Sequence, residues 1–517
     1  MNCFSEKKNM SKKFYVTTPI YYPSGNLHLG HAYTTTLADI LNRYKKEQGY
    51  ETYFLTGSDE HGQKIEAKAK EAKLTPLEYL NPKVENFKQL WTKLNIVYDK
   101  FIRTTDDYHE QAVKKLFTKL YEKGLIYKGQ YEGIYCVSCE EFLTAEQVDE
   151  NGFCKISNTQ PQKVNEDTYF LKVSEFQNFV EELLKTEFLI PDYRRNEMLK
   201  NFVEPGLKDL SVTRVSFKWG IPIDQDPNHI IYVWLDALSN YITALGYLQD
   251  DGHLFKKFWA DPETEILQLA GKEIIRFHSI YWPVILKALD LRQPTHLLGH
   301  GWILNKNTKM SKSLGNVIDP MKIIELYSSD ALRFYIANDL PTEKDGNFSL
   351  ELFLESFNAH LANNVGNLIS RTHNMITKYF DGYIDLTDVE YDSELINLSM
   401  RTIDQYIENM DQYKISSAVR NVLNLSAACN KFIEDQAPWN LAKEQNTYQL
   451  KNVLATLQRS MSIISYLLKP ILVEKYDDMI EQCGLKNVKL DFNNLKTFKD
   501  LKFNKLGDKR VLFVRIK

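Results

Sequence analysis

An α/β fold is predicted for this sequence: a parallel β-sheet that carries a small insertion and is followed by an all-α region. Three observations predict it. Between residues 13 and 128, short runs of β-branched and aromatic residues alternate with segments of helical spacing, as in a parallel sheet with crossover helices. From residue 129 to 192 this alternation breaks. Beyond residue 348, nearly every segment has helical spacing, which predicts a helical bundle.

The first elements follow from their residues. Residues 13–19 (KFYVTTP) are a β-branched and aromatic run that predicts a buried strand, and the proline and glycine that come next end it. Apolar residues at helical spacing over 30–48 predict a helix. A second strand is expected at 52–55, just before the polar string TGSDEHG.

The same patterns divide the rest of the chain. Short alternating runs such as 167–173 predict a β-rich insertion, and strands are expected at 230–235 and 266–270, with helices beginning near Asp236 and Lys272. Long helices are expected at 350–380, 393–410, 415–433 and 448–468. The expected domains are the first half of the sheet domain (1–128), the insertion (129–192), the second half of the sheet domain (193–300), a loop and linker region (301–348), and the helical domain with its tail (349–517).

Composition excludes some classes of protein. Hydrophobic residues make up 43% and charged residues 26% of the 517 residues, which is ordinary for a globular protein of two to four domains. No apolar run reaches the roughly 18–20 residues that cross a bilayer, and the first residues, MNCFSEKKNMSKK, lack the apolar stretch of a signal peptide. Because the cysteines are also sparse, we expect a cytoplasmic protein with no membrane contact.

Charge limits the possible nucleic-acid surfaces. The formal net charge of −4 argues against a general polyanion binder, so a specific nucleic-acid partner needs a local basic surface. The tail 501–517 is one candidate, because it holds six Lys or Arg residues and one Asp. The alternative is a solvated chain end.

Two short strings indicate chemistry. The first is His28-Leu29-Gly30-His31, at the start of the predicted helix 30–48. Histidines three apart share a helix face, and a helix start offers backbone N–H groups and the positive end of the dipole to a phosphate. Gly30 lets a ligand approach the backbone closely. The alternative is two ordinary surface histidines.

The second string is Lys309-Met310-Ser311-Lys312-Ser313, in a polar loop before Gly315. Lysines on such a loop can neutralise charge that develops on a leaving pyrophosphate, and the alternative is a basic surface loop. Together the two strings predict a site that holds the triphosphate of ATP from both sides. Such an enzyme would adenylate a carboxylate, which is already ionised at pH 7 and needs no general base.

Further strings carry a resemblance to a known family. HLGH and KMSKS resemble the signatures of class I aminoacyl-tRNA synthetases, and several strings are similar to those of the methionyl-tRNA synthetase family: PIYYP at 19–23, GSDEHG at 57–62, YVWLDA at 232–237, GKEIIRFH at 271–278 and APW at 437–439. The resemblance implies a Rossmann-type catalytic domain, an inserted connective domain and an anticodon-binding bundle. It also implies the activity: methionine and ATP give methionyl-adenylate and pyrophosphate, and methionine is then esterified to the 3′-terminal adenosine of initiator and elongator tRNA(Met).

The resemblance assigns the ATP site. His28 and His31 would stabilise the α-phosphate during attack by the methionine carboxylate, and Lys312, helped by Lys309, would stabilise the departing pyrophosphate. Mg²⁺ would accompany ATP. The residues implied to bind ATP are His28, Gly30, His31, Lys309, Ser311 and Lys312.

The methionine site is assigned in the same way. Asp59 matches the family position that holds the substrate ammonium, with a helix-capping aspartate as the alternative. Arg214 matches an arginine near that carboxylate, with an ordinary surface ion pair as the alternative. Aromatic faces suit a thioether, although such residues are also common in cores. The implied pocket consists of Ile20, Tyr22, Trp234, Ala237, Leu238 (where some relatives have proline), Tyr241, Ile274 and His278.

In the helical region, Asn367, Arg371 and Trp439 match positions that read the CAU anticodon. An exposed tryptophan can stack on an unpaired base, and a packing wedge after Ala-Pro is the alternative. The oligonucleotide-binding domain that dimerises some relatives has no counterpart before the end of the sequence, so we expect a monomer.

The insertion departs from the family pattern. Relatives often carry a zinc knuckle with four ligands, but here Cys136, Cys139 and Cys154 are followed by Ser157 at the fourth position. A structural zinc site needs four good ligands. We therefore expect an incomplete knuckle without structural zinc.

Three alternatives stay open at this level. A synthetase for Leu, Ile or Val would carry a longer editing insertion, and one for Cys would need a thiol-binding metal in its pocket. A small-molecule nucleotidyltransferase could share HxGH but would need neither KMSKS nor a helical bundle. A non-catalytic tRNA-binding protein would have no need for intact histidines and lysines.

Overall fold

The predicted parallel sheet is present in the computed structural model, which describes residues 12–137, 141–143, 147–306, 308–310, 316–498 and 501–516. Its strands lie in the order β3-β2-β1-β11-β12-β7, and every neighbouring pair is parallel. Because the chain leaves β1 toward β2 on one side while β11 lies on the other, the strand order reverses between β1 and β11. Their bounds are β1 Lys13–Thr17, β2 Glu51–Ser58, β3 Lys100–Arg103, β7 Leu189–Ile190, β11 Thr264–Gly271 and β12 His296–His300.

The chain forms two units, which we call the sheet unit and the helical unit. The sheet unit comprises Met1–Leu27, Glu51–Leu90 and Val97–His300. The helical unit comprises His28–Tyr50, Trp91–Ile96 and Gly301–Lys517. The domain boundaries that we drew from the sequence stay a prediction.

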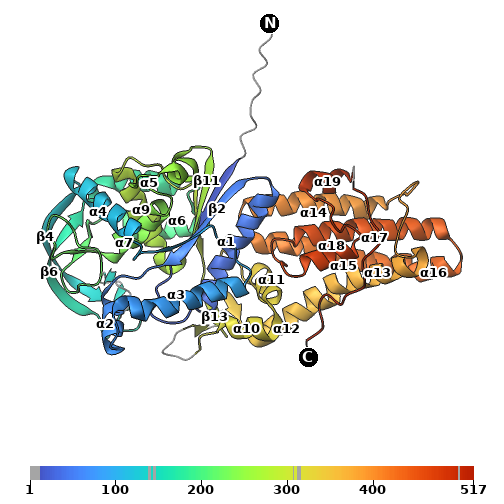
Figure 1. Cartoon of the computed structure of the whole chain (residues 1–517), viewed down its shortest axis with the longest axis horizontal. Coiled ribbons are helices and arrows are strands. Elements are labelled where there is room, and N and C mark those ends of the chain that lie inside the picture. The colour runs from blue at the N-terminus through green and yellow to red at the C-terminus, as the bar shows by residue number, and fades with distance from the viewer. Residues whose placement is uncertain are drawn as a thin grey trace, which may run out of the picture. The chain divides into compact units, whose positions relative to one another are not determined.

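Helices surround the strands within the sheet unit (Figure 1). One apolar core joins strands and helices, and it includes Tyr15, Leu55, Leu116, Tyr241, Ile266 and Ile285. The α-helices are α2 Gln63–Glu71, α3 Pro76–Lys93, α4 Asp107–Glu122, α5 Gln177–Lys185, α6 Asp192–Met198, α7 Val233–Thr243, α8 His253–Phe255 and α9 Trp282–Ala288. Shorter helical turns are η2 Val173–Phe176, η3 Leu199–Val203, η4 Lys256–Ala260, η5 Lys272–Ile274 and η6 Phe277–Tyr281.

The insertion is built on an antiparallel sheet with the strand order β5-β4-β6-β8. Its long strands β4 (Ile126–Cys136) and β6 (Gln162–Leu171) form the teal ribbon in Figure 1. The expected run at 167–173 is mainly the end of β6. The short strands are β5 Glu141–Leu143 and β8 Leu210–Ser211. In contrast, β7 lies between residues 129 and 192 but joins the parallel sheet beside β12.

The strand expected at 230–235 is wrong in its second half. Only Ile230–Ile231 form a strand, β10, which pairs antiparallel with β9 (Thr213–Arg214) outside the parallel sheet. Tyr232 has extended backbone angles, and its carbonyl accepts the N–H groups of Leu235 and Asp236, which starts α7 at Val233. An apolar run of this length suits a buried helix as well as a buried strand.

The helical unit contains the expected bundle. Helices α13, α14, α15 and α17 run alongside one another (Figure 1). The four expected long helices are confirmed as α12 Leu350–Ser356 continued by η8 Phe357–Gly366 and α13 Asn367–Phe380, α14 Ser393–Asp411, α15 Ile415–Gln436 and α17 Thr447–Leu467. Helices that the pattern did not predict are α16 Pro438–Lys443, α18 Tyr476–Gln482 and α19 Phe492–Thr497.

Helix α1 (Leu29–Glu47), which begins at the first string, belongs to this helical unit. The link is a fully buried ion pair, in which the Arg333 guanidinium lies 2.7 Å from the Asp39 carboxylate. Arg333 comes from α11 (Ser329–Asp339) and also donates to the carbonyls of Leu94, Pro470 and Ile471. One guanidinium therefore satisfies four acceptors and joins four segments of the chain. A small sheet precedes the bundle: β13 Ile303–Asn305, β14 Thr308–Lys309 and β15 Gly346–Phe348, with α10 Pro320–Tyr327 between β14 and β15.

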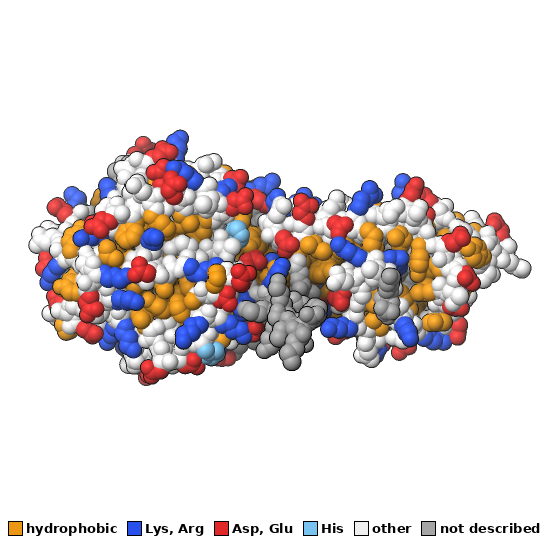
Figure 2. Space-filling model, turned by 90° about the horizontal axis from the view of Figure 1, so that it is seen from above, with side chains coloured by type: hydrophobic (Ala, Val, Ile, Leu, Met, Phe, Trp, Pro, Cys, Tyr) orange, Lys and Arg blue, Asp and Glu red, His pale blue; other side chains and the backbone are white. Residues whose placement is uncertain are grey.

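The described part of the basic tail packs on the helical unit. Asn358 and Ile516 exchange two hydrogen bonds, and Phe513 is buried against Phe357. Arg510 forms an ion pair with Asp478. At least one of the tail's cations is therefore partly neutralised within the protein. On the face shown in Figure 2, basic and acidic side chains are intermingled rather than gathered by sign.

No helix in the described ranges is long and apolar enough to cross a membrane.

Candidate functional site

The two histidines of the first string cap helix α1. The His28 Nδ1 atom accepts the N–H of Gly30 at 3.1 Å, and the His31 Nδ1 atom accepts the N–H of His28 at 3.0 Å. In neutral rings, therefore, both protons are on Nε2, which makes each imidazole an N–H donor. The two rings lie 4.0 Å apart between centroids. This arrangement suits hydrogen bonding to one phosphate.

The structure corrects one expectation about this helix start. The N–H groups of Leu29, Gly30 and His31 are already bonded to the Ile318 carbonyl, the His28 ring and the His28 carbonyl. The first backbone N–H groups are thus used within the protein, and the imidazoles carry the donor capacity. A side chain at Gly30 would come within 3.0 Å of the His28 ring, which explains the glycine.

The segment that follows the second string contacts the first string. The Leu29 N–H donates to the Ile318 carbonyl at 3.1 Å, which joins the start of α1 to the segment that follows the second string. Asn305 donates its side-chain N–H to the Asn316 carbonyl at 2.7 Å across the base of the loop. The backbone of Lys309 lies in β14 opposite Leu304. The Lys309 side chain and residues Ser311 and Lys312 lie outside the described residues.

The methionine-site candidates of the sheet unit gather at one edge of the parallel sheet. Ile20 and Tyr22 follow β1, Asp59 follows β2, and Ile274 and His278 follow β11. The carboxyl ends of parallel strands meet at this edge, next to the reversal of strand order, where ligands bind in open α/β sheets. Helix α7 contributes the others, and one apolar cluster contains or contacts Ile20, Trp234, Leu238, Tyr241 and Ile274.

Aromatic contacts organise this edge. Trp234 stacks on Phe277 with 3.6 Å between ring centroids and planes that differ by 6°. The Tyr241 hydroxyl lies 2.7 Å from His278 Nε2, while His278 Nδ1 lies 3.0 Å from the Ile274 carbonyl. Because a carbonyl only accepts, Nδ1 carries the proton and Nε2 accepts from Tyr241. Burial lowers the pKa of His278 to about 4, so the ring is neutral at pH 7.

A buried charge network lies beside these residues. Asp236 on α7 accepts from His61 Nδ1 at 2.7 Å and from His109 Nε2 at 2.7 Å. Burial alone would lower the pKa of His61, but the charge of Asp236 and hydrogen bonds to Asp236 and Glu110 raise it to about 10. Burial alone would raise the pKa of Asp236, but the charge of His61 and the two histidine hydrogen bonds lower it to about 2. Both groups are therefore charged at pH 7.

This network fixes the loop after β2, which carries one methionine-site candidate, Asp59, and hydrogen-bonds to another, Tyr22. The His61 carbonyl accepts the Tyr22 hydroxyl at 3.1 Å, and Asp59 is two residues before His61. Asp59 is largely buried, and its backbone N–H donates to the Tyr21 carbonyl at 3.0 Å. The His61–Asp236 pair thus joins the loop after β2 to the start of α7.

Arg214 is buried in β9. Its guanidinium stacks over Tyr232 at 3.8 Å, pairs with Glu166 at 3.7 Å and donates to Ser211. This ion pair is buried, so it is not the surface ion pair that was the alternative, and a role near the substrate carboxylate stays a prediction.

The anticodon candidates lie along the helical unit. Asn367 and Arg371 are one turn apart on α13; Asn367 donates to Asn430 at 3.1 Å, and Arg371 pairs with Glu434 at 2.6 Å. Both partners are on α15. Trp439 lies in α16, just past the end of α15, and 36% of its surface is exposed.

The cysteine cluster is only partly described. The Cys136 thiol lies 3.2 Å from the Ser157 hydroxyl and 3.5 Å from the Thr159 hydroxyl, and Cys154 is also buried. Cys139 lies outside the described residues. In the parts of the chain that the structure describes, no group of three or more His, Cys, Asp or Glu side chains is arranged to hold a metal. The expectation about zinc stays a prediction.

The sequence matches a family model described as tRNA synthetases class I (M), over residues 14–152 and 149–373. Relatives named methionine–tRNA ligase match over most of the chain. The one from Clostridium tetani is 46% identical over 92% of this chain and 74% of its own length. The one from Ureaplasma parvum is 44% identical over 98% of both chains.

The chain belongs to the methionine–tRNA ligase family of class I tRNA synthetases.

Solved structures agree with this assignment. The methionyl-tRNA synthetase of Mycobacterium tuberculosis in complex with methionyl-adenylate is 31% identical and superposes with a TM-score of 0.89, over 97% of this chain and 99% of that one. The apo form of that enzyme has a TM-score of 0.85 at 28% identity.

Sequence reasoning missed the buried network. His61 and Asp236 lie inside two strings that carried the family resemblance, so the strings were a signal, but neither residue was singled out. His109 lies in an ordinary amphipathic helix and gave no signal. Phe277, the stacking partner of Trp234, lies in GKEIIRFH and was also passed over.

Proposed function

We propose that this member of the methionine–tRNA ligase family activates L-methionine with ATP and transfers it to tRNA. The methionine carboxylate attacks the α-phosphorus of ATP, and pyrophosphate leaves. Methionyl-adenylate then esterifies the 3′-terminal adenosine of tRNA(Met), both initiator and elongator. The membership of the family and the likeness to a solved structure that holds methionyl-adenylate support both steps.

The adenylation step is assigned to the first and second strings. MgATP is the substrate, and the Mg²⁺ bound to its phosphates reduces their charge. His28 and His31 each present an Nε2–H donor to the α-phosphate, where negative charge grows during attack. Lys309 and Lys312 neutralise the leaving pyrophosphate, with Gly30 and Ser311 beside the phosphates. No general base is needed, because the attacking carboxylate is ionised.

Methionine selection is assigned to the carboxyl edge of the parallel sheet. Asp59 holds the substrate ammonium. The thioether side chain packs among Ile20, Tyr22, Trp234, Ala237, Leu238, Tyr241, Ile274 and His278. The neutral His278 ring and its bond to Tyr241 set polar atoms in an otherwise apolar pocket. Such contacts help to reject plain aliphatic side chains, because methylene differences alone give only about 1–3 kcal/mol of discrimination.

One observation carries the proposal: the hydrogen bond from Leu29 N–H to the Ile318 carbonyl. It joins the start of the histidine-capped helix to the segment just after the lysine string. Because adenylation needs donors for the α-phosphate and cations for the leaving group at one ATP molecule, strings that are far apart in sequence have to meet in space.

ATP–pyrophosphate exchange tests the activity. Exchange with methionine, and at most traces with Leu, Ile, Val or Cys, is expected. Exchange with another amino acid would favour a different class I synthetase. Exchange with none, in protein that is folded, would overturn the proposal.

His28→Asn tests the catalytic assignment. Asparagine is a good helix cap, so α1 and the melting temperature should be kept, while loss of the Nε2–H donor should lower kcat about 100-fold. His253→Asn, at an exposed histidine, is the matched control and should keep full activity. A His28→Asn variant as active as the parent would refute the role of this histidine.

Trp439→Ala tests the anticodon assignment of Asn367, Arg371 and Trp439. Loss of one stacked base should raise the KM for tRNA at least tenfold, with ATP–pyrophosphate exchange unchanged. Tyr448→Ala removes another exposed aromatic ring of the bundle and is the control. Equal loss of exchange and of charging in Trp439→Ala would contradict the assignment.

Three sequence-based expectations complete the proposal: a monomer, a cytoplasmic location and no structural zinc. Native mass spectrometry and metal analysis of the purified protein test the first and third. One equivalent of tightly bound zinc would contradict the incomplete knuckle of Cys136, Cys139 and Cys154.

A further inference from the structure

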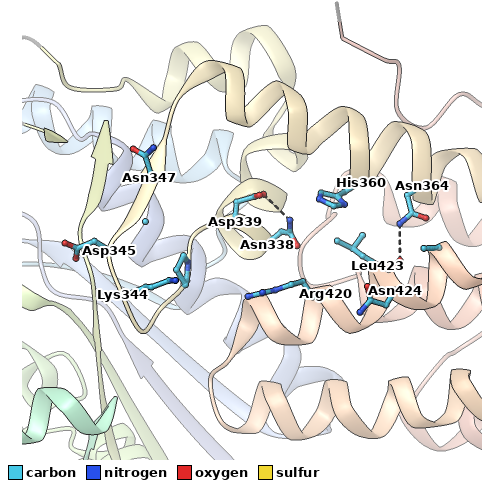
Figure 3. A pocket seen from close by; sticks show the side chains of 13 residues that line it. Asn338, Asp339, Lys344, Asp345, Asn347, His360, Asn364, Arg420, Leu423 and Asn424 are labelled. Carbon is cyan, nitrogen blue, oxygen red and sulfur yellow. Dashed lines mark hydrogen bonds between the residues drawn. The ribbon is translucent and has the colours of Figure 1, made fainter. Parts of the chain in front are cut away.

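A polar pocket lies in the helical unit, and none of the site residues named above lines it. It is an open cavity of about 650 Å³ between the end of α11, the loop before β15, η8 and the first half of α15. This volume is within the usual range for small-ligand pockets. Figure 3 shows the side chains that line it, among them Asn338, Asp339, Lys344, His360, Asn364 and Arg420.

One side chain of the pocket lining holds a buried acceptor that needs a donor. Asn338 is 9% exposed, and its side-chain N–H donates to Asp339 at 3.1 Å. Its Oδ1 atom has no hydrogen-bond partner in the described ranges of the chain. A buried acceptor in this condition costs about 1–3 kcal/mol. The atom is closed to solvent in this structure, so a ligand N–H or O–H satisfies it only when the Asn338 side chain turns toward the cavity.

Charges on the rim are mixed. The Oδ2 atom of Asp339 accepts the Ser356 hydroxyl at 2.6 Å. Burial raises the pKa of Asp339, and hydrogen bonds together with the charges of His360 and Arg420 oppose that rise. Arg420 itself is exposed on α15, and its two hydrogen bonds to Ser416 on the same helix are long, at 3.3 and 3.4 Å. The pocket lining therefore combines amide and carboxylate acceptors with the His360 ring and two cations, Lys344 and Arg420.

A series of side-chain hydrogen bonds connects this pocket to the proposed anticodon residues. Asn364 lines the pocket and accepts at Oδ1 from Asn430 at 3.2 Å, and Asn430 in turn accepts from Asn367 at 3.1 Å. One turn further, Arg371 pairs with Glu434. The residue numbers of the paired side chains increase together along η8–α13 and along α15, so these two segments run in the same direction. At about 1.5 Å per residue, the pocket lies within a few nucleotides' reach of Arg371.

We propose that this pocket holds a single unstacked nucleotide of the same tRNA. The proposal rests on the proposed function. With the Asn338 side chain turned toward the cavity, an exocyclic amine of the base donates to its Oδ1 atom, the His360 ring offers a face for stacking, and Arg420 contacts an adjoining phosphate. Amide and carboxylate side chains read base edges in this way, and unpaired bases stack on rings and are gripped by arginine.

Filter binding of a tRNA(Met) transcript tests the proposal with two variants of different chemistry. Arg420→Gln should weaken binding about tenfold and flatten its salt dependence by about one phosphate contact. Asn338→Leu, of similar volume but without the acceptor, should weaken binding at least fivefold with an unchanged salt slope. Arg401→Gln, at an exposed arginine of α14, is the matched control and should bind within twofold of the parent.

Two further readouts separate the possible failures. ATP–pyrophosphate exchange without tRNA should stay within twofold of the parent in all variants, which shows that they are folded. Chemical probing of the transcript should show one nucleotide that the parent protects and both variants expose.

Parent-like binding and probing in both variants would overturn the pocket proposal while the proposed function stands, provided that the parent exchanges and charges. If free AMP or CMP raises the melting temperature of the parent but not of Asn338→Leu, and tRNA binding is unchanged, the pocket takes a free nucleotide and the tRNA proposal is wrong.

Discussion

Replacing Asp236 by asparagine removes one charge from the buried His61–Asp236–His109 network without a change in volume. His61 has its pKa raised from 6.5 to about 10, which corresponds to about 5 kcal/mol at 1.36 kcal/mol per pH unit. The pKa of Asp236 falls from 3.8 to about 2, which corresponds to about 2 kcal/mol. Both numbers describe the same attraction, so they are counted once. Both values already include the cost of burial, and the smaller one describes the loss of charge at Asp236 itself, which is what the substitution changes.

The expected loss of stability at pH 7 is therefore about 3 kcal/mol, at the low end for breaking a buried ion pair. For a unit of this size it corresponds to a fall of about 6–12 °C in melting temperature. The effect depends on pH in a definite direction. The His61 contribution is complete below pH 6.5 and is lost as the pH rises toward 10, whereas the Asp236 contribution is complete above pH 3.8 and is lost as the pH falls through 2. The difference between variant and parent should thus shrink from pH 6 to pH 9.5.

Differential scanning fluorimetry over that pH range measures the effect. Asp251→Asn removes the same kind of pair, Asp251 with His253, from an exposed site, and should shift the melting temperature by less than about 2 °C because surface pairs contribute little. An Asp236→Asn variant that melts with the parent would refute the charge network. So would a difference that grows between pH 6 and pH 9.5.

Three other outcomes follow from the contacts. Gly30→Ala should lower the rate of exchange at least tenfold, because its Cβ atom crowds the capping imidazole at 3.0 Å, while the melting temperature stays within about 2 °C because alanine favours the helix; parent-like exchange would contradict this. Tyr241→Phe leaves the buried His278 Nε2 atom without its donor and should raise the KM for methionine about tenfold. Because the pKa of His278 in the parent is about 4, the exchange rate of the parent should show no titration of this ring between pH 5.5 and 8. Arg333→Met should lower the melting temperature by about 10 °C, since the buried Asp39 carboxylate then keeps only Arg43 of its two arginine partners and three backbone carbonyls lose their donor. Adding Asp39→Asn should restore part of the loss, and no recovery would show that the ion pair is not the cause.

Much of the fold was predictable because local residue patterns have few solutions. The strand at residues 13–19 and the helix at 30–48 are confirmed within two residues at each end, since β-branched runs, glycine, proline and helical spacing act over short distances. The helices of the bundle followed for the same reason. The error at residues 230–235 also has a local cause, because an uninterrupted apolar run has no period that separates a buried strand from a buried helix.

The candidate site was predictable only as far as its strings extend. His28, His31 and the methionine-site candidates after β1, β2 and β11 lie at element ends that the alternation of strands and helices already located. Which hydrogen-bond donors they present was not predictable. The backbone N–H groups of α1 are consumed by Ile318 and His28 itself, and only the folded chain shows that the imidazoles take their place.

The sequence by itself determined the class of fold, the family and most of the residues proposed to act, because these depend on patterns within a few turns or a few residues. The tertiary structure alone decided how distant residues combine. Asp236 meets His61 and His109 across 175 and 127 residues of sequence, and Arg333 meets Asp39 at full burial. No local pattern records such meetings, because the energy that selects them appears only when folding removes both partners from water.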